Sequence, residues 1–205
     1  MTSRVYLGLL LAAVLLACSG ESSAQTAPDR KPLPREQRQE AAHKYFTDVA
    51  LVNQHGETLR FYSDLIKGKV VVINVFFTSC HGSCPPMIMS MQKIQEQLGD
   101  RLGKDAHLIS ITVDPAIDTP AQLKEYARRF KARPGWHFIT GKKEAVEFAL
   151  AKLGQAVKSR EDHTNIFIIG NETTGLWKKA FGLANPDDLL KVVASVVADK
   201  GDDAR

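Results

Sequence analysis

The chain has 205 residues, of which 44% are hydrophobic, and its formal net charge is +4. This composition is typical of one globular domain with a core of ordinary size and additional material at one end. Basic residues are scattered, as in Arg128-Arg129 and Lys142-Lys143, and no basic stripe alternates with aromatic side chains. We therefore expect no nucleic-acid partner.

The chain begins with the pattern of a secretory signal. Arg4 precedes an unbroken apolar run over residues 5–17, which is short for a membrane span, and Cys18 follows Leu15-Leu16-Ala17 directly. This junction resembles the lipobox of bacterial lipoproteins, in which the cysteine is acylated and becomes the first residue. Leu16 is bulky for the second lipobox position, so an ordinary signal or an uncleaved anchor stays open as an alternative.

We expect residues 1–17 to be a lipoprotein signal peptide and Cys18 to carry the lipid. The mature protein would then be anchored on the extracytoplasmic, periplasmic side of a bacterial membrane. The segment over residues 21–40 is polar, with three prolines among charged residues, and cannot bury a core. These features predict a flexible membrane tether over residues 18–45 and a folded domain over residues 46–205.

The folded domain alternates strand and helix patterns in chain order. Strands are predicted at hairpin residues 49–61, over residues 69–77, 107–113 and 136–139, and in a second hairpin over residues 165–181. Helices are predicted from residue 85 to 99, after the capping box Thr119-Pro120-Ala121-Gln122, over residues 146–153, and after Asn185. This order predicts an α/β fold, namely a thioredoxin-like three-layer α/β/α sandwich with an extra N-terminal β-hairpin.

Two cysteines stand where the first buried strand meets a helix, in Cys80-His81-Gly82-Ser83-Cys84-Pro85. With Cys18 taken by lipid, they form the one remaining pair in an oxidising compartment. A disulfide across so short a loop would add little stability, so we expect the pair to react or to bind. The helix N-terminus favours thiolates, which serve both disulfide exchange and soft-metal binding.

The sequence departs from thioredoxins at two places. Thioredoxins use C-x-x-C with a cis-proline opposite, whereas this dithiol has one residue more and no proline occurs between Gly135 and Asn185. Asp162-His163-Thr164 stands where that proline is expected, and the fold would bring it beside the cysteines. A neutral imidazole with two thiolates suits Cu(I), and Cu(II) with a water; zinc is chemically possible, but a structural zinc site would need a fourth protein ligand.

Three motifs together resemble the signatures of the Sco/SenC family over residues 46–197, and they are Phe77-Thr78-Ser79-Cys80 to Cys84-Pro85, Thr112-Val113-Asp114-Pro115 with Asp118-Thr119-Pro120, and Asp162-His163-Thr164. The resemblance implies a membrane-tethered copper-binding protein that helps to assemble the dinuclear copper centre of cytochrome c oxidase. It implies Cys80, Cys84 and His163 as copper ligands, and subunit II of the oxidase or another copper acceptor as partner. One departure is His81, where the family often has proline.

Two functions use the same sulfurs. A metallochaperone without catalytic turnover is favoured. The alternative is a thiol–disulfide oxidoreductase that acts on periplasmic cysteine pairs, with Cys80 and Cys84 as a redox-active pair that forms a disulfide when oxidised. Copper binding would also require a thiol reductase to keep the pair reduced.

A copper or redox sensor is a weaker third possibility. A peroxiredoxin is excluded because Ile73 and Phe77 occupy the proline and hydroxyl positions of its pattern.

Other side chains near the motif have weaker claims. His81 could be a fourth ligand or could lower a thiol pKa, but we expect an exposed modulator. Met91 belongs to the apolar helix stripe and is predicted as core, whereas Met87 keeps a small chance as a ligand. The second ring nitrogen of His163 needs a partner, which Asp162 or Asp114 could supply. The other histidines, His43, His55, His107 and His137, receive no role.

Overall fold

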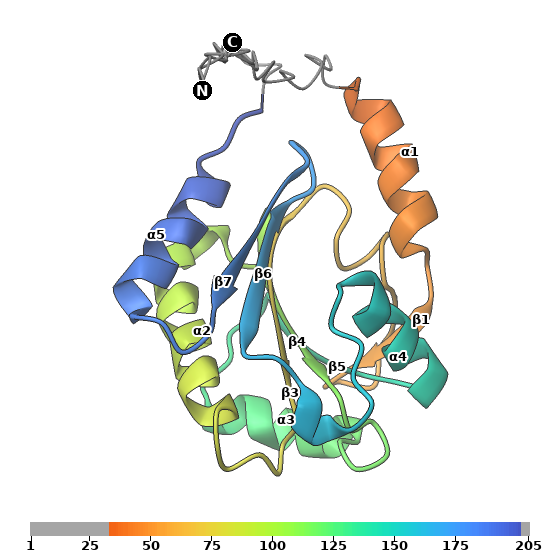
Figure 1. Ribbon diagram of the computed structural model, residues 1–205, viewed down its shortest axis with the longest axis vertical. Coiled ribbons are helices and arrows are strands. Elements are labelled where there is room, and N and C mark those ends of the chain that lie inside the picture. The colour runs from red at the N-terminus through yellow and green to blue at the C-terminus, as the bar shows by residue number, and fades with distance from the viewer. Residues whose placement is uncertain (1–32, 202–205) are drawn as a thin grey trace, which may run out of the picture. The chain divides into compact units, whose positions relative to one another are not determined.

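The computed structural model describes residues 33–201 (Figure 1). The predicted signal peptide, the lipidation site Cys18 and the first part of the tether lie outside these residues. Within the described part of the chain, no helix is both long and apolar enough to cross a membrane.

One mixed sheet of seven strands forms the middle layer, in the order β2-β1-β5-β4-β3-β6-β7. The β3–β4 and β4–β5 pairs are parallel and the other pairs are antiparallel. The strands are β1 (Ala50–Asn53), β2 (Thr58–Arg60), β3 (Val70–Phe76), β4 (Ala106–Thr112), β5 (Trp136–Thr140), β6 (Ile166–Asn171) and β7 (Leu176–Phe181).

Helices cover both faces of this sheet, as predicted for the three-layer sandwich. Figure 1 shows α2 and α5 on one side and α1 and α4 on the other, and buried side chains of α3 pack in the same core as α2 and α5. The helices are α1 (Arg35–Phe46), α2 (Cys84–Leu98), α3 (Pro120–Arg129), α4 (Lys143–Lys152) and α5 (Pro186–Val197), with 3-10 turns η1 (Gly99–Arg101) and η2 (Arg160–Asp162).

The central strand β3 explains how the two cores form. All seven of its residues are buried. Because successive side chains of a strand point to opposite faces, Val70, Val72 and Phe76 join the core under α2, while Val71, Ile73 and Val75 join the core under α1 and α4. A run of β-branched and aromatic residues without polar alternation therefore places β3 between two helical layers, with its carboxyl end leading into the cysteine motif.

The predicted tether extends too far toward the domain, and the structure corrects its end. Residues 35–46 form helix α1, which hydrogen-bonds to the folded domain: Arg38 donates to the Thr173 carbonyl at 3.1 Å and Tyr45 donates to the Lys152 carbonyl at 2.8 Å. The polar composition of this segment suggested that it could not join a core. It buries only Phe46, which packs against aromatic rings of the domain, and the two hydrogen bonds add to this attachment.

Candidate metal centre

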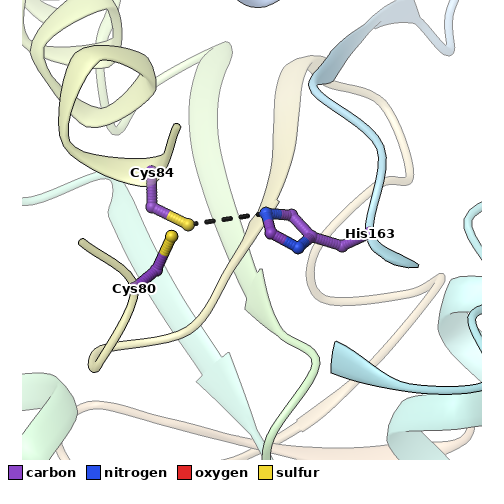
Figure 2. Close-up of side chains that lie close together, drawn as sticks. All are labelled: Cys80, Cys84 and His163. Carbon is purple, nitrogen blue, oxygen red and sulfur yellow. Dashed lines mark hydrogen bonds between the residues drawn. The ribbon is translucent and has the colours of Figure 1, made fainter. Parts of the chain in front are cut away.

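Three side chains converge at the carboxyl end of β3. The sulfurs of Cys80 and Cys84 and a ring nitrogen of His163 all lie within 4.8 Å of one another. Figure 2 shows the two thiols and the imidazole pointing toward one another from three different segments. Among the side chains that the structure describes, which leave out Glu161, no other group of three or more histidine, cysteine, aspartate or glutamate donors is as close together.

The sheet topology brings these residues together. Cys80 follows β3, Cys84 is the first residue of α2, and His163 precedes β6. Since β3 and β6 are antiparallel neighbours, the end of one lies beside the start of the other. The loop after β3 and the loop before β6 therefore meet at one edge of the sheet. Cys84 Sγ and His163 Nε2 are 3.5 Å apart across this junction.

The two thiols differ in exposure and acidity. Cys84 is fully buried, and this burial, together with the neighbouring Cys80 thiol, raises the pKa of Cys84 to about 12. Cys80 is partly exposed. Its partial burial opposes ionisation, but hydrogen bonds from the Cys84 thiol and from backbone N–H groups of Gly82, Ser83 and Cys84 lower the pKa of Cys80. Cys80 is therefore the first of the pair to become a thiolate.

The orientation of His163 follows from a backbone contact. Its Nδ1 lies 2.7 Å from the carbonyl oxygen of Arg160, which can only accept a hydrogen bond. Nδ1 therefore carries the proton, and the Nε2 lone pair faces Cys84. The ring of Phe77 stands edge-on to the imidazole, with 5.4 Å between the centroids. The partner of Nδ1 is thus the Arg160 carbonyl, and neither Asp162 nor Asp114 supplies it.

A buried carboxylate fixes the strand ends below the cysteines. Asp118 is 1% exposed and accepts hydrogen bonds from the backbone N–H of Thr78 at 3.1 Å and from the hydroxyls of Thr78 and Thr112. Thr78 follows β3 and Thr112 ends β4, so one side chain ties two parallel strands at the edge where the site is built. The turn that carries Cys80 starts from this fixed point.

The donor set suits a soft or borderline metal ion, because thiolates and imidazole are the ligands that such ions prefer. The 3.5 Å between Cys84 Sγ and His163 Nε2 also fits one bridging ion. With the metal–sulfur and metal–nitrogen lengths of a tetrahedral zinc site, the two ligand atoms would be about 3.5 Å apart. The Cys80 and Cys84 sulfurs lie within 4.8 Å of each other, so the pair is also placed for thiol–disulfide exchange.

Comparison with known proteins decides the family. The family model described as SCO1/SenC matches residues 36–198, which include α1 from its second residue onward and all three converging residues. The chain belongs to the SCO1/SenC family. The resemblance found from the three sequence motifs is confirmed, and so is the thioredoxin-like fold.

Individual relatives agree with this assignment to the SCO1/SenC family. The SCO1 protein homolog of Bacillus subtilis is 33% identical over 153 residues, which are 70% of this chain and 78% of that protein. A Stutzerimonas stutzeri protein whose name includes copper binding is 31% identical over 122 residues, or 60% of this chain and 54% of that one. The solved structure of BsSco, described as a Sco family member with a disulfide switch, superposes with a TM-score of 0.60 at 31% identity, covering 74% of this chain and 92% of BsSco.

Three side chains near the donor group of this SCO1/SenC protein, His81, Met87 and Met91, are not part of it. His81 is exposed and lies outside the donor group, so the expectation of an exposed side chain is confirmed, and its effect on the site stays a prediction. Met91 is fully buried in the core, as predicted. Met87 is also fully buried, against the backbone of Gly182, where an added Cβ would come within 2.9 Å of the methionine sulfur.

Several interactions of this SCO1/SenC chain were not predicted from sequence. His107 Nδ1 and His137 Nε2 lie 3.3 Å apart on the neighbouring strands β4 and β5, and His43 lies 3.1 Å from Asp48. The contact between His107 and His137 follows from the strand pairing. His137 pairs with Ile109, and the side chain of His107, two residues earlier on β4, points to the same face of the sheet. Arg160 also received no role, although its carbonyl orients His163.

Proposed function

We propose that this protein binds copper through Cys80, Cys84 and His163 and delivers it to, or helps to mature, the dinuclear copper centre of cytochrome c oxidase. The observation that carries the proposal is the convergence of two sulfurs and one imidazole nitrogen within 4.8 Å. Two relatives support the assignment, because BsSco is described as a member of a family of cytochrome c oxidase assembly proteins and the Stutzerimonas stutzeri relative is named for copper binding.

The two thiols would take up copper in order. Cys80 is the more exposed sulfur and the first to ionise, so it is the natural first ligand for arriving copper. Cys84 loses its proton when the ion enters, because a metal cation replaces that proton between the sulfur and His163 Nε2. Cu(I) is satisfied by two thiolates, whereas Cu(II) favours the added imidazole nitrogen.

The test is a titration of the reduced chain with Cu(I) and Cu(II), compared with His163→Ala. The variant should bind Cu(II) more weakly and lose the ligand-to-metal charge-transfer spectrum of the wild type. His55→Ala is the matched control, because His55 is exposed and lies outside the donor group. Unchanged Cu(II) affinity and spectrum in His163→Ala would remove the third ligand from the proposal.

A second function, thiol–disulfide exchange, is favoured by the difference between the two thiols. The Cys80 thiolate would attack a partner disulfide and form a mixed disulfide. Cys84 would then attack the Cys80 sulfur and release the partner as a dithiol, so that the partner gains two electrons and the Cys80–Cys84 pair becomes a disulfide. Exchange with a periplasmic cysteine pair that is no faster than with glutathione would contradict this role.

We also propose that lipid at Cys18 anchors the protein on the extracytoplasmic side of the membrane, where a thiol reductase keeps the cysteine pair reduced. The support is the lipobox-like Leu15-Leu16-Ala17-Cys18 after a basic residue and an apolar run. Cys18→Ala should abolish incorporation of labelled palmitate and move the protein out of the membrane fraction. Labelling of the variant at the wild-type level would contradict lipidation at this residue.

A further inference from the structure

Arg160, in the loop that carries His163, makes two contacts with residues at the ends of sheet strands. Arg160 Nη1 donates to Asp114 Oδ2 at 2.7 Å, and the guanidinium carbon lies 5.3 Å from the centre of the Phe77 ring. Phe77 directly follows β3, and Asp114 comes two residues after the end of β4. Arg160 therefore connects the loop to the carboxyl ends of two parallel strands.

The same residue also contacts the imidazole. The Arg160 carbonyl accepts the Nδ1–H of His163 at 2.7 Å, while the Phe77 ring that lies under the guanidinium meets the imidazole edge-on. A movement of Arg160 would thus withdraw the hydrogen bond that orients His163 and the attachment of its loop together. Arg160 therefore links the position of the loop, through its side chain, to the direction in which His163 Nε2 points, through its carbonyl.

An exposed ion pair would have little effect, since surface salt bridges contribute about 0–1 kcal/mol. This pair is different because the Asp114 side chain is only 14% exposed, and the guanidinium also covers an aromatic ring. Arg160 and Asp114 both line a groove of about 630 Å³, which residues 156–160 of the loop, residues 113–116 and α4 border. Two further side-chain bonds, between Ser159 and Asp162 and between Thr164 and Gln155, stay within the loop.

We infer that Arg160 is a positioning residue for the third metal ligand: clamped between Asp114 and Phe77, it holds His163 Nε2 toward the two sulfurs. This inference rests on the proposed copper function. Its consequence is selective, because the cysteines come from other segments and keep their geometry when the loop moves. Arg160 therefore supports the binding of Cu(II), which uses the imidazole, more than that of Cu(I), which two thiolates satisfy.

The experiment compares Arg160→Ala with the wild type in the full chain, with Cu(II) and Cu(I) as separate probes. Loss of a residue that orients a metal-ligating histidine typically costs about 10–100-fold in metal affinity, so Cu(II) affinity should fall at least about 10-fold and Cu(I) affinity much less. The nitrogen hyperfine signal of the imidazole in the Cu(II) spectrum should weaken. Arg128→Ala is the matched control, because Arg128 forms an exposed ion pair with Glu125 on α3.

Two further variants keep the inference falsifiable. Asp114→Asn removes the charge partner of Arg160 and leaves the sequence of the loop unchanged, so it should also weaken Cu(II) binding more than Cu(I) binding. If Arg160→Ala fails to fold, this variant tests the inference in its place. Arg160→Ala combined with His163→Ala should lose no more Cu(II) affinity than His163→Ala alone. Unchanged Cu(II) affinity in folded Arg160→Ala, with His163→Ala still weakened, would overturn the inference alone. A wild type without copper affinity would overturn the proposed function as well.

Discussion

Cys84 Sγ and His163 Nε2 face each other at 3.5 Å although 79 positions separate them in the chain. The antiparallel pairing of β3 with β6 produces this proximity, because it places the start of β6 beside the end of β3. The site therefore depends on sheet register more than on any local motif. A dithiol at the end of a strand becomes a three-donor site only when another strand delivers its preceding loop to the same edge.

The different acidity of the two thiols predicts ordered alkylation. Cys80 should react with iodoacetamide first and at a pH below the ordinary thiol range, because hydrogen bonds to its sulfur lower its pKa. Cys84 should stay protected, since its burial raises its pKa to about 12. Mass spectrometry of the singly modified protein checks this order, and urea-unfolded protein, in which both thiols should react alike, is the control. Preferential modification of Cys84 in the folded protein would contradict the order.

Asp118→Asn should destabilise the domain. The amide would turn one acceptor oxygen into a donor that faces the donors of Thr78 and Thr112 in a buried pocket, and an unsatisfied buried group costs about 1–3 kcal/mol. Urea denaturation followed by circular dichroism measures the change in the free energy of unfolding. The exposed Asp100→Asn is the control and should change it by less than about 0.5 kcal/mol. Equal effects of the two substitutions would mean that Asp118 does not fix the strand ends.

Phe46→Ala tests whether α1 belongs to the folded domain. Phe46 is 8% exposed and packs against Phe61, Tyr62 and Trp177, so its truncation should cost about 3–5 kcal/mol of unfolding free energy. The exposed Gln37→Ala on the same helix should leave stability nearly unchanged. Both effects are read from the midpoint and slope of urea unfolding. A negligible loss in Phe46→Ala would mean that α1 is an independent appendage.

The imidazole pair on β4 and β5 predicts a loss of stability in acid. Burial and the neighbouring His107 lower the pKa of His137 to about 4, below the 6.5 of the unfolded state. The folded state therefore resists protonation that the unfolded state accepts, so stability is retained above about pH 6.5 and lost as the pH falls from there toward 4. Unfolding free energies measured across this window should fall less steeply in His137→Gln than in the wild type. Parallel pH profiles would show that His137 does not carry this acid sensitivity.

Much of the fold follows from local patterns in the sequence. The run of β-branched and aromatic residues over 69–77 predicts the buried central strand, and the capping box of Thr119 and Gln122 is present in the structure with both of its hydrogen bonds. Asn185 likewise caps α5 through its side chain. Each of these sequence patterns lies within a few residues of the strand or helix end that it produces, so it can be recognised without knowing the tertiary structure.

The details that tune the site lie beyond such local signals. Arg160 meets Asp114 across 46 positions, and neither residue shows in the sequence which partner it will take. The thiol asymmetry depends on how deeply Cys84 is buried, which is a property of the packed core. Helix α1 was missed because one buried residue, Phe46, and a few polar hydrogen bonds attach it, and the polar composition of the segment reveals neither. The three converging donors were identified in advance, and their role as metal ligands stays a prediction.

If lipid at Cys18 anchors the protein, as proposed above, the docking of α1 limits how far the domain can move from the membrane. If lipid holds Cys18, only residues 19–34 separate the anchor from the first turn of α1, and sixteen residues extend at most about 55 Å. A tether that ran to residue 45 would extend to about 95 Å. With that anchor, the shorter linker would raise the local concentration of the domain near copper acceptors in the membrane and would favour acceptors whose metal site projects only a short way from the bilayer.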